Sequence, residues 1–291
     1  MNFRPILPHK YAAICLGIGL GLGVIGLGLA RLLAGLPVSG WLFWLGLLTI
    51  VCFAAGVYFL YLAFAYFYLT YRLDRNGLQI RWGGVTQRVP IRCLTQIIPA
   101  GEVPLPAKQL HTLSLPDWWV GRWGQTHFYA TTDAAHALVA RTDTDDVVIS
   151  PTDPEAFIRA WELRIPLGPT QIWSQEVVRW GVLNWPIWRD RLAWRLAGGA
   201  ALVYAIVLGA SLTAFPAWPD TIPLNLDSLG RTIISKEQVL WLPRIGGMIL
   251  GLNLILGIVW HKKEPLAAYL LWSVTIVVQI GLWVAIRTII N

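Results

Sequence analysis

VVISPTDPEAF, residues 147–157, reads as a β-strand that turns directly into an α-helix. Three consecutive β-branched residues favour the strand, and Asp153 followed by Pro154 makes a favourable N-cap and first helical residue. The spacing of Phe157, Ile158 and Trp161 predicts one buried face along that helix. The buried face of this helix requires a core to pack against, so we predict that the segment ending here is a folded domain.

Apolar runs lie on both sides of this polar segment, which covers residues 71–164. The chain of 291 residues is 56% hydrophobic and 13% charged, whereas soluble proteins contain about 25% charged residues. We therefore predict an integral membrane protein with an uncleaved first helix and no disulfide framework. Five runs exceed the ~20 residues that span a bilayer: 11–36, 41–70, 194–215, 240–260 and 265–286.

The net charge of +7 arises at the edges of these runs, because residues 71–179 contain equal numbers of basic and acidic residues. This distribution follows the positive-inside rule and excludes a nucleic-acid partner. We predict a bacterial inner-membrane protein whose N-terminus and polar segment are cytoplasmic. The loop 216–238 and the C-terminus are then predicted to lie outside.

Short alternating runs within the polar segment predict about eight β-strands. Asn76-Gly77 between two such runs is a strong hairpin signal. The predicted strands are 70–73, 78–82, 86–91, 94–98, 112–115, 126–131, 137–141 and 147–149.

Four parts of the chain follow from these patterns: a transmembrane hairpin (1–70), the polar domain (71–165), a linker (166–193) and a three-helix membrane region (194–291). In the linker, Trp173, Val177 and Trp180 lie at helical spacing with polar residues between them. This spacing predicts an amphipathic helix in the membrane interface.

The polar domain resembles a bacterial pleckstrin-homology (PH)-like domain of the membrane-anchored kind. The resemblance implies a strongly bent, barrel-like antiparallel sheet with a C-terminal helix, and it implies no catalytic residues. The matching positions are Tyr71, Leu73, Gly77-Leu78, Ile80-Arg81, Val89, Ile91, Ile97, Gly121-Arg122, Tyr129-Ala130-Thr131, Val148 to Pro151, Asp153-Pro154 and Phe157.

A second, fainter resemblance covers residues 212–243, with Pro219 to Leu224, Gly230, Lys236 and Leu242-Pro243. This region is similar to the uncharacterised domain of sporulation-delaying-protein immunity proteins. That family usually has a histidine after Ile-Pro-x, where this chain has Asn225.

Two groups of residues are candidates for binding. Arg72, Arg75, Arg81, Arg88 and Arg92 crowd the first strands of the polar domain and could bind an anionic surface. Trp118, Trp119 and Trp123 are a candidate contact for another protein, although tryptophans also fill cores.

The glycines at positions 21, 23 and 26 match a dinucleotide motif by letters, but they lie inside an apolar run. Close helix packing is the interpretation we prefer for the pairs Gly17/Gly21, Gly19/Gly23 and Gly247/Gly251. No metal site, cofactor or catalytic constellation is predicted, because the histidines are isolated and the spans contain no internal Asp or Glu.

The sequence favours a non-enzymatic membrane protein whose PH-like domain acts as a scaffold or binding subunit. Membrane lipids, another membrane protein or a peptide are the expected partners, and the oligomeric state stays open. An immunity or envelope-stress role against peptide toxins is the alternative. A lipid-modifying enzyme or a transporter ranks lowest.

Overall fold

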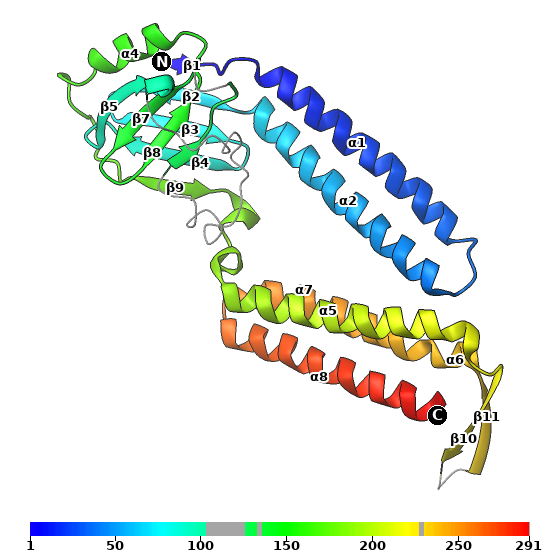
Figure 1. Cartoon of the computed structure of the whole chain (residues 1–291). Helices are drawn as coiled ribbons and strands as arrows, with labels where there is room; N and C mark the ends of the chain where they lie inside the picture. Colours follow the sequence, from blue (N-terminus) through cyan, green and yellow to red (C-terminus); the bar gives the residue numbers. More distant parts are fainter. Residues whose placement is uncertain (103–125, 133–135, 227–229, 291) are drawn as a thin grey trace. The chain divides into compact units, whose positions relative to one another are not determined.

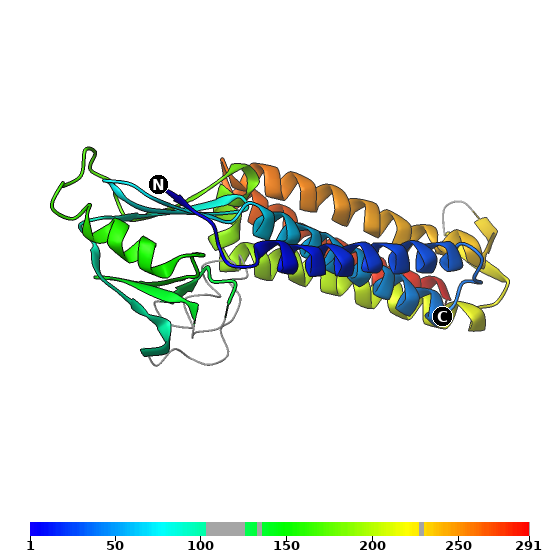
Figure 2. The same cartoon turned by 90° about the horizontal axis from the view of Figure 1, so that it is seen from above.

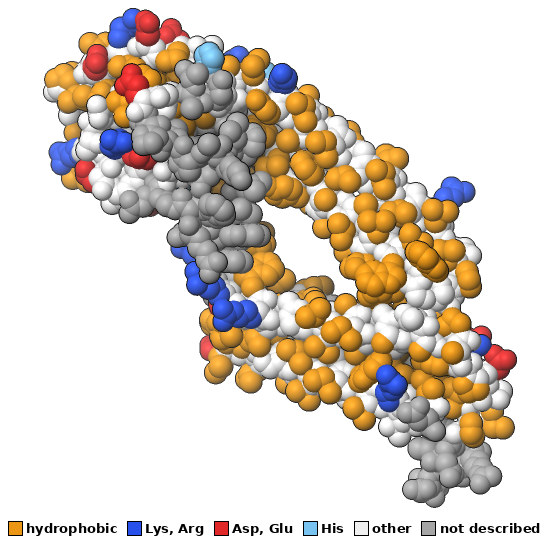
Figure 3. Space-filling model, in the orientation of Figure 1, with side chains coloured by type: hydrophobic (Ala, Val, Ile, Leu, Met, Phe, Trp, Pro, Cys, Tyr) orange, Lys and Arg blue, Asp and Glu red, His pale blue; other side chains and the backbone are white. Residues whose placement is uncertain are grey.

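A computed structural model of the chain describes residues 1–102, 126–132, 136–226 and 230–290 (Figure 1). In this part of the chain, five helices are long and apolar enough to cross a membrane. They are α1 (Pro8–Leu33), α2 (Gly40–Phe67), α5 (Arg191–Ala214), α7 (Trp241–His261) and α8 (Pro265–Ile290). Hydrophobic side chains cover their visible surfaces (Figure 3), as contact with lipid requires. The five predicted spans are confirmed, and the chain is a multi-pass membrane protein.

The chain divides into two compact units. One unit contains residues 1–22 and 54–188, and the other contains residues 23–53 and 189–291. The first unit holds the β-rich domain together with the helical segments that lead into it. The second unit is helical and carries a separate β-hairpin.

The β-rich domain is built from two sheets, with helix α4 (Pro154–Glu162) following the last strand of the second. The first sheet is antiparallel and has the strand order β1-β2-β3-β4-β9. The second sheet has the order β5-β7-β8-β6, in which β6 runs parallel to β8. The strands are β1 (Asn2–Phe3), β2 (Thr70–Leu73), β3 (Gly77–Trp82), β4 (Val85–Pro90), β5 (Leu94–Pro99), β6 (Thr126–Phe128), β7 (Leu138–Thr142), β8 (Asp146–Ile149) and β9 (Glu176–Arg179).

Alternation along the strands places one face of each sheet in a shared core. Tyr71, Leu78 and Ile149 are fully buried there, and Phe157 of α4 packs edge-on against Phe3 at 4.9 Å between ring centroids. The Tyr71 hydroxyl donates to the Tyr129 carbonyl at 2.6 Å, and burial raises the pKa of this tyrosine above its usual value. Aromatic residues therefore join both sheets and the helix.

The predicted helix start and the predicted hairpin are both confirmed. The Asp153 carboxylate accepts from the Ala156 N–H at 2.8 Å, with Pro154 as the first helical residue. Gly77 follows the turn at φ +150°, and an added Cβ would lie 2.1 Å from the Val89 carbonyl oxygen. Only glycine fits this close approach of two strands.

Two strands lie outside the predicted domain of residues 71–165. The N-terminal arm contributes β1, and the Ile6 N–H donates to the Ser150 carbonyl at 3.0 Å. The linker contributes β9, which pairs with β4. The predicted interfacial helix through Trp173, Val177 and Trp180 is therefore wrong. Two adjacent valines favour a strand, and β4 offers an edge of backbone groups that need partners.

The predicted strand at 112–115 lies outside the described residues. The predicted strand at 126–131 ends at Phe128. The remaining predicted strands match observed ones within one residue at each end, as expected for element boundaries.

In the second unit, α5, α7 and α8 lie side by side (Figures 1 and 2). A hairpin of β10 (Thr221–Leu226) and β11 (Gly230–Ser235) follows α5, and α6 (Lys236–Val239) leads from it into α7. Ile222 and Phe215 belong to the buried cluster at this end of the helices. The region predicted as the outer loop is thus a packed hairpin.

Candidate functional site

Three of the predicted arginines share the outer face of the first sheet. The strand register aligns Arg72 of β2 with Gln79 of β3, Arg88 of β4 and then Glu176 of β9. Arg81 lies two residues further along β3, on the same face. Their side chains point away from the core because these positions alternate with the buried residues of each strand.

The ion pairs on this face leave part of its charge unmatched. Arg88 contacts Glu176 at 2.9 Å and lies 5.8 Å above the Trp173 ring. Arg72 is 3.9 Å from Asp74, with 61% of its side chain exposed. Arg81 forms no ion pair within the described residues. Exposed pairs of this kind contribute about 0–1 kcal/mol, so an incoming anion can replace them.

Arg75 and Arg92 lie apart from that face. Arg75 is in the turn before β3, and Arg92 follows β4 in the neighbouring turn. The Ile91 N–H donates to the Asn76 carbonyl at 2.9 Å, which holds the two turns together. The structure therefore splits the predicted arginine cluster into a face of three residues and an end of two. Trp118, Trp119 and Trp123 lie outside the described residues.

The arginine face belongs to a domain that is fixed directly to α2. Strand β2 begins at Thr70, after α2 ends at Phe67. Tyr66 of α2 packs edge-on against Trp82 of β3 at 4.7 Å between ring centroids, and Gly83 approaches Ala65. This short connection and its aromatic contact hold the first sheet at the end of the helix.

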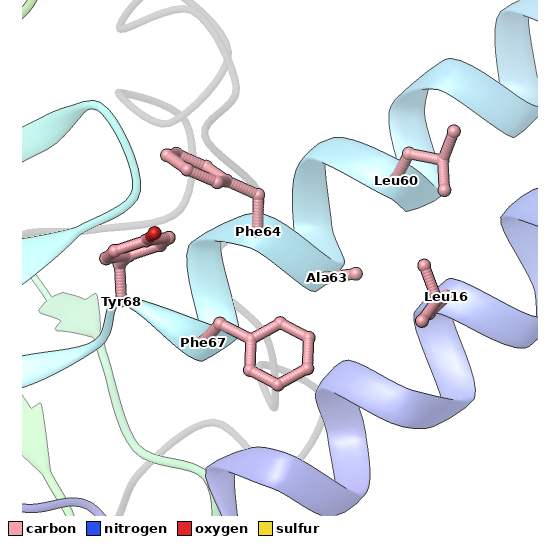
Figure 4. A pocket seen from close by; sticks show the side chains of 6 residues that line it. All are labelled: Leu16, Leu60, Ala63, Phe64, Phe67 and Tyr68. Carbon is pink, nitrogen blue, oxygen red and sulfur yellow. The ribbon is translucent and has the colours of Figure 1, made fainter.

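An open groove of about 480 Å³ lies where α1 and α2 approach the domain. Leu16 of α1 points toward Leu60 and Ala63 of α2, and Phe67 completes this side (Figure 4). Phe64 and Tyr68 provide the remaining lining. All of these lining side chains are apolar except for the hydroxyl of Tyr68, so the groove offers an apolar contact.

A polar cluster around the buried His261, which the sequence did not reveal, lies at one end of the second unit. We call Asp190, His261 and Tyr269 the Asp190 cluster. One carboxylate oxygen of Asp190 contacts His261 Nε2 at 2.7 Å and accepts from the Tyr269 hydroxyl. The other oxygen caps α5 by accepting from the N–H groups of Leu192 and Ala193. One side chain thus joins the ends of three helices.

Two opposing effects act on the pKa of Asp190. Burial is the larger single influence and raises it, whereas the four hydrogen bonds together lower it and prevail. The net result is a pKa below the usual value, so the group is a carboxylate at neutral pH. His261 is 2% exposed, and its Nδ1 has no partner within the described residues. Among the described residues, the carboxylate is the only hydrogen-bond partner of the imidazole, and the ring also lies against Tyr269 and Trp272.

Further polar contacts continue from this cluster along α7 and α8. Trp272 donates to the Asn253 carbonyl at 3.1 Å, and the Asn253 amide donates to the Thr275 hydroxyl at 2.8 Å. Gln279 donates to the Gly246 carbonyl at 2.7 Å. Each contact joins the same two helices, which fits the predicted role of such residues in helix association.

The predicted glycine pairs are only partly at helix contacts. A Cβ at Gly19 would lie 2.9 Å from Leu60, and one at Gly247 would lie 2.5 Å from the Tyr204 hydroxyl. A Cβ at Gly17, Gly21, Gly23 or Gly251 would meet no described atom within 4 Å. Gly19 and Gly247 therefore lie at helix contacts, whereas the other glycines of these pairs do not.

Among the described residues, no group of three or more His, Cys, Asp or Glu side chains is placed to hold a metal ion. Asp190 and His261 could have been suspected from sequence only weakly. Asp190 precedes an apolar run as an N-cap does, but nothing in its spacing from His261 or Tyr269 predicts their contact.

Residues 69–165 match a family model described as Bacterial PH domain. The two sheets and the following helix agree with this match, which covers about a third of the chain. The comparisons with curated proteins and with solved structures found no match. The expected resemblance is confirmed: a bacterial PH domain is joined to five candidate membrane helices.

Proposed function

We propose that this chain is a non-enzymatic binding subunit of the bacterial inner membrane, whose cytoplasmic PH domain holds an acidic segment of a partner protein. The observation that carries the proposal is the outer face of the first sheet. Arg72, Arg81 and Arg88 lie there on adjacent strands, and the nearby acidic side chains form only exposed pairs. Guanidinium groups suit carboxylates because they bind them through two parallel hydrogen bonds.

A partner protein is favoured over the lipid surface by the way the domain is anchored. Each surface cation near anionic lipid contributes about 1 kcal/mol. The two membrane helices α1 and α2 already tie this domain to the bilayer. Additional attraction to lipid would change its location little, whereas a charged face can select a protein.

The test is purification of the full chain from membranes in mild detergent, with identification of co-purifying proteins and lipids. The double variant Arg72→Gln/Arg81→Gln removes two charges from the face. Arg4→Gln/Arg159→Gln removes two exposed charges elsewhere in the same unit.

A specific protein that is lost at least tenfold in the first variant and retained in the control would support the proposal. Selective loss of an anionic lipid would assign the face to lipid instead. Absence of any specific protein from the wild-type preparation would overturn it. A contact through Trp118, Trp119 and Trp123 remains a prediction. If the complex is unchanged after alanine replacement of all three, these tryptophans do not contact the partner.

An immunity or envelope-stress role is the second candidate, and the folded hairpin β10–β11 favours it. Lys236 contacts Asp220 at 2.7 Å at the base of this hairpin, and Ile222 is buried beneath it. A fixed hairpin at the proposed outer side could contact a peptide toxin. Unchanged sensitivity to peptide bacteriocins after deletion of the gene would count strongly against this role.

A further inference from the structure

The hairpin β10–β11 is a two-stranded sheet whose outer edges lie beyond the helices. Its strands run across the helix ends and not along the helix axes (Figure 1). The Lys236 N–H donates to the Asp220 carbonyl at 3.2 Å, and the Ser235 N–H donates to Gln238 Oε1 at 3.2 Å. These bonds and the buried Ile222 hold the base of the hairpin in place.

The strand register shows which backbone groups point outward. The bond from Lys236 to Asp220 makes that pair a hydrogen-bonded one, and such pairs alternate along an antiparallel ladder. The pairs Ile222/Ile234 and Leu224/Thr232 therefore bond inward. The intervening pairs direct their backbone N–H and C=O groups away from the partner strand; these pairs are Pro223/Ile233 and Asn225/Arg231. Pro223 has no N–H to bond inward, in agreement with this assignment.

The two edges of the hairpin differ. The edge of β10 contains Pro223, which lacks an N–H and obstructs an incoming strand, as protected edges commonly do. The edge of β11 contains Ile233 at the facing position, with 71% of its side chain exposed. A free edge strand with an exposed β-branched residue is a template for another strand.

We propose that β11 pairs antiparallel with β11 of a second copy of this chain, which makes a four-stranded sheet across a two-fold axis. In the register that uses the outward groups, Ile233 faces Ile233 of the partner and exchanges both backbone bonds with it. Arg231 then lies opposite Ser235 of the partner, so the two arginines are not paired with each other.

A second copy fits this edge better than a free peptide because of how the membrane orients the chains. The helices α5, α7 and α8 hold every copy with its hairpin at the same end. A two-fold axis along the helices relates strands that lie across them in antiparallel fashion. Two copies therefore present the same edge at the same height in the membrane.

The first test places a cysteine at the proposed axis of the full chain in membranes. Cys15, Cys52 and Cys93 are replaced by alanine, and Ile233→Cys is oxidised under mild conditions. Facing residues of a hydrogen-bonded antiparallel pair have Cα atoms about 5.5 Å apart, which suits a disulfide. A covalent dimer is expected. Thr221→Cys, on the β10 edge, is the matched control and should remain monomeric.

The second test changes the edge without changing the hairpin. Ile233→Pro removes an outward N–H and adds a ring at the edge. The hairpin should tolerate a proline there, because Pro223 already occupies the facing position on β10. The dimer fraction counted by single-molecule photobleaching should fall at least tenfold. Ile233→Ala keeps the N–H and should retain most of the dimer. An unchanged melting temperature of the monomer would verify that Ile233→Pro is folded.

Three results would overturn the proposal. The wild-type chain could be monomeric at native density, or Thr221→Cys could cross-link more readily than Ile233→Cys. Alternatively, Ile233→Pro could leave the dimer unchanged while abolishing capture of an added extended peptide. That last outcome would assign the β11 edge to peptide binding.

Discussion

Replacement of Asp190 tests whether one carboxylate stabilises the three-helix bundle. Asp190→Asn keeps an oxygen that can cap α5, but it replaces the oxygen that accepts from His261 and Tyr269. Hydrogen bonds to a charged group contribute about 1.5–3 kcal/mol, and His261 would remain buried without its acceptor. We expect a loss of about 2 kcal/mol in the free energy of unfolding.

Asp190→Ala also removes the helix cap, which contributes about 1 kcal/mol, so its total loss should be about 3 kcal/mol. Unfolding of the purified chain by SDS, followed by tryptophan fluorescence, gives both values. Asp220→Asn is the control, because 89% of the Asp220 side chain is exposed where it pairs with Lys236, and little change is expected. Equal losses for the two Asp190 variants, or none, would refute the assigned roles.

Three further predictions follow from individual contacts. The pKa of Asp190 is lowered in the folded chain, so its contribution should be present above the ordinary value of 3.8 and disappear as the pH falls below it. In SDS unfolding, acidification below that value should cost the wild type more stability than it costs Asp190→Asn, which retains the acid-sensitive Asp220. Gly257→Ala places a Cβ 2.4 Å from Trp272 and should cost about 1–3 kcal/mol, whereas Gly251→Ala meets open space and should not. Tyr71→Phe removes the donor to the Tyr129 carbonyl and should cost about 1–3 kcal/mol, seen as faster hydrogen exchange in the β-rich domain.

Local patterns predicted the elements whose partners are close in sequence. Asn76-Gly77 gave the hairpin, and Asp153-Pro154 gave the helix start, because a turn or a cap depends on a few adjacent residues. Apolar runs gave the five spans, because a bilayer requires length and hydrophobicity and little else.

Contacts between distant residues were beyond this kind of prediction. β1 and β9 join the sheet from outside the predicted domain. β1 has only two residues, and Val177 of β9 also fits the helical spacing of the linker. Residues 176–179 of the linker pair with β4 and do not form the helix that their spacing predicted. Leaving the backbone groups at the edge of β4 unpaired would cost more free energy than the preference of these residues for a helix provides. The Asp190 cluster depends on how three helix ends meet, which residue spacing does not encode.

The two proposed contacts can be separated because they lie in different units of the chain. Pairing at β11 would bring two PH domains together in one assembly, so a partner with two acidic segments would bind both faces with a higher effective concentration. Ile233→Pro should then weaken partner retention although the arginine face is unchanged. Arg72→Gln/Arg81→Gln should weaken retention while the dimer persists. If retention is independent of the dimer, the partner contacts one face, and the pairing of β11 serves another purpose.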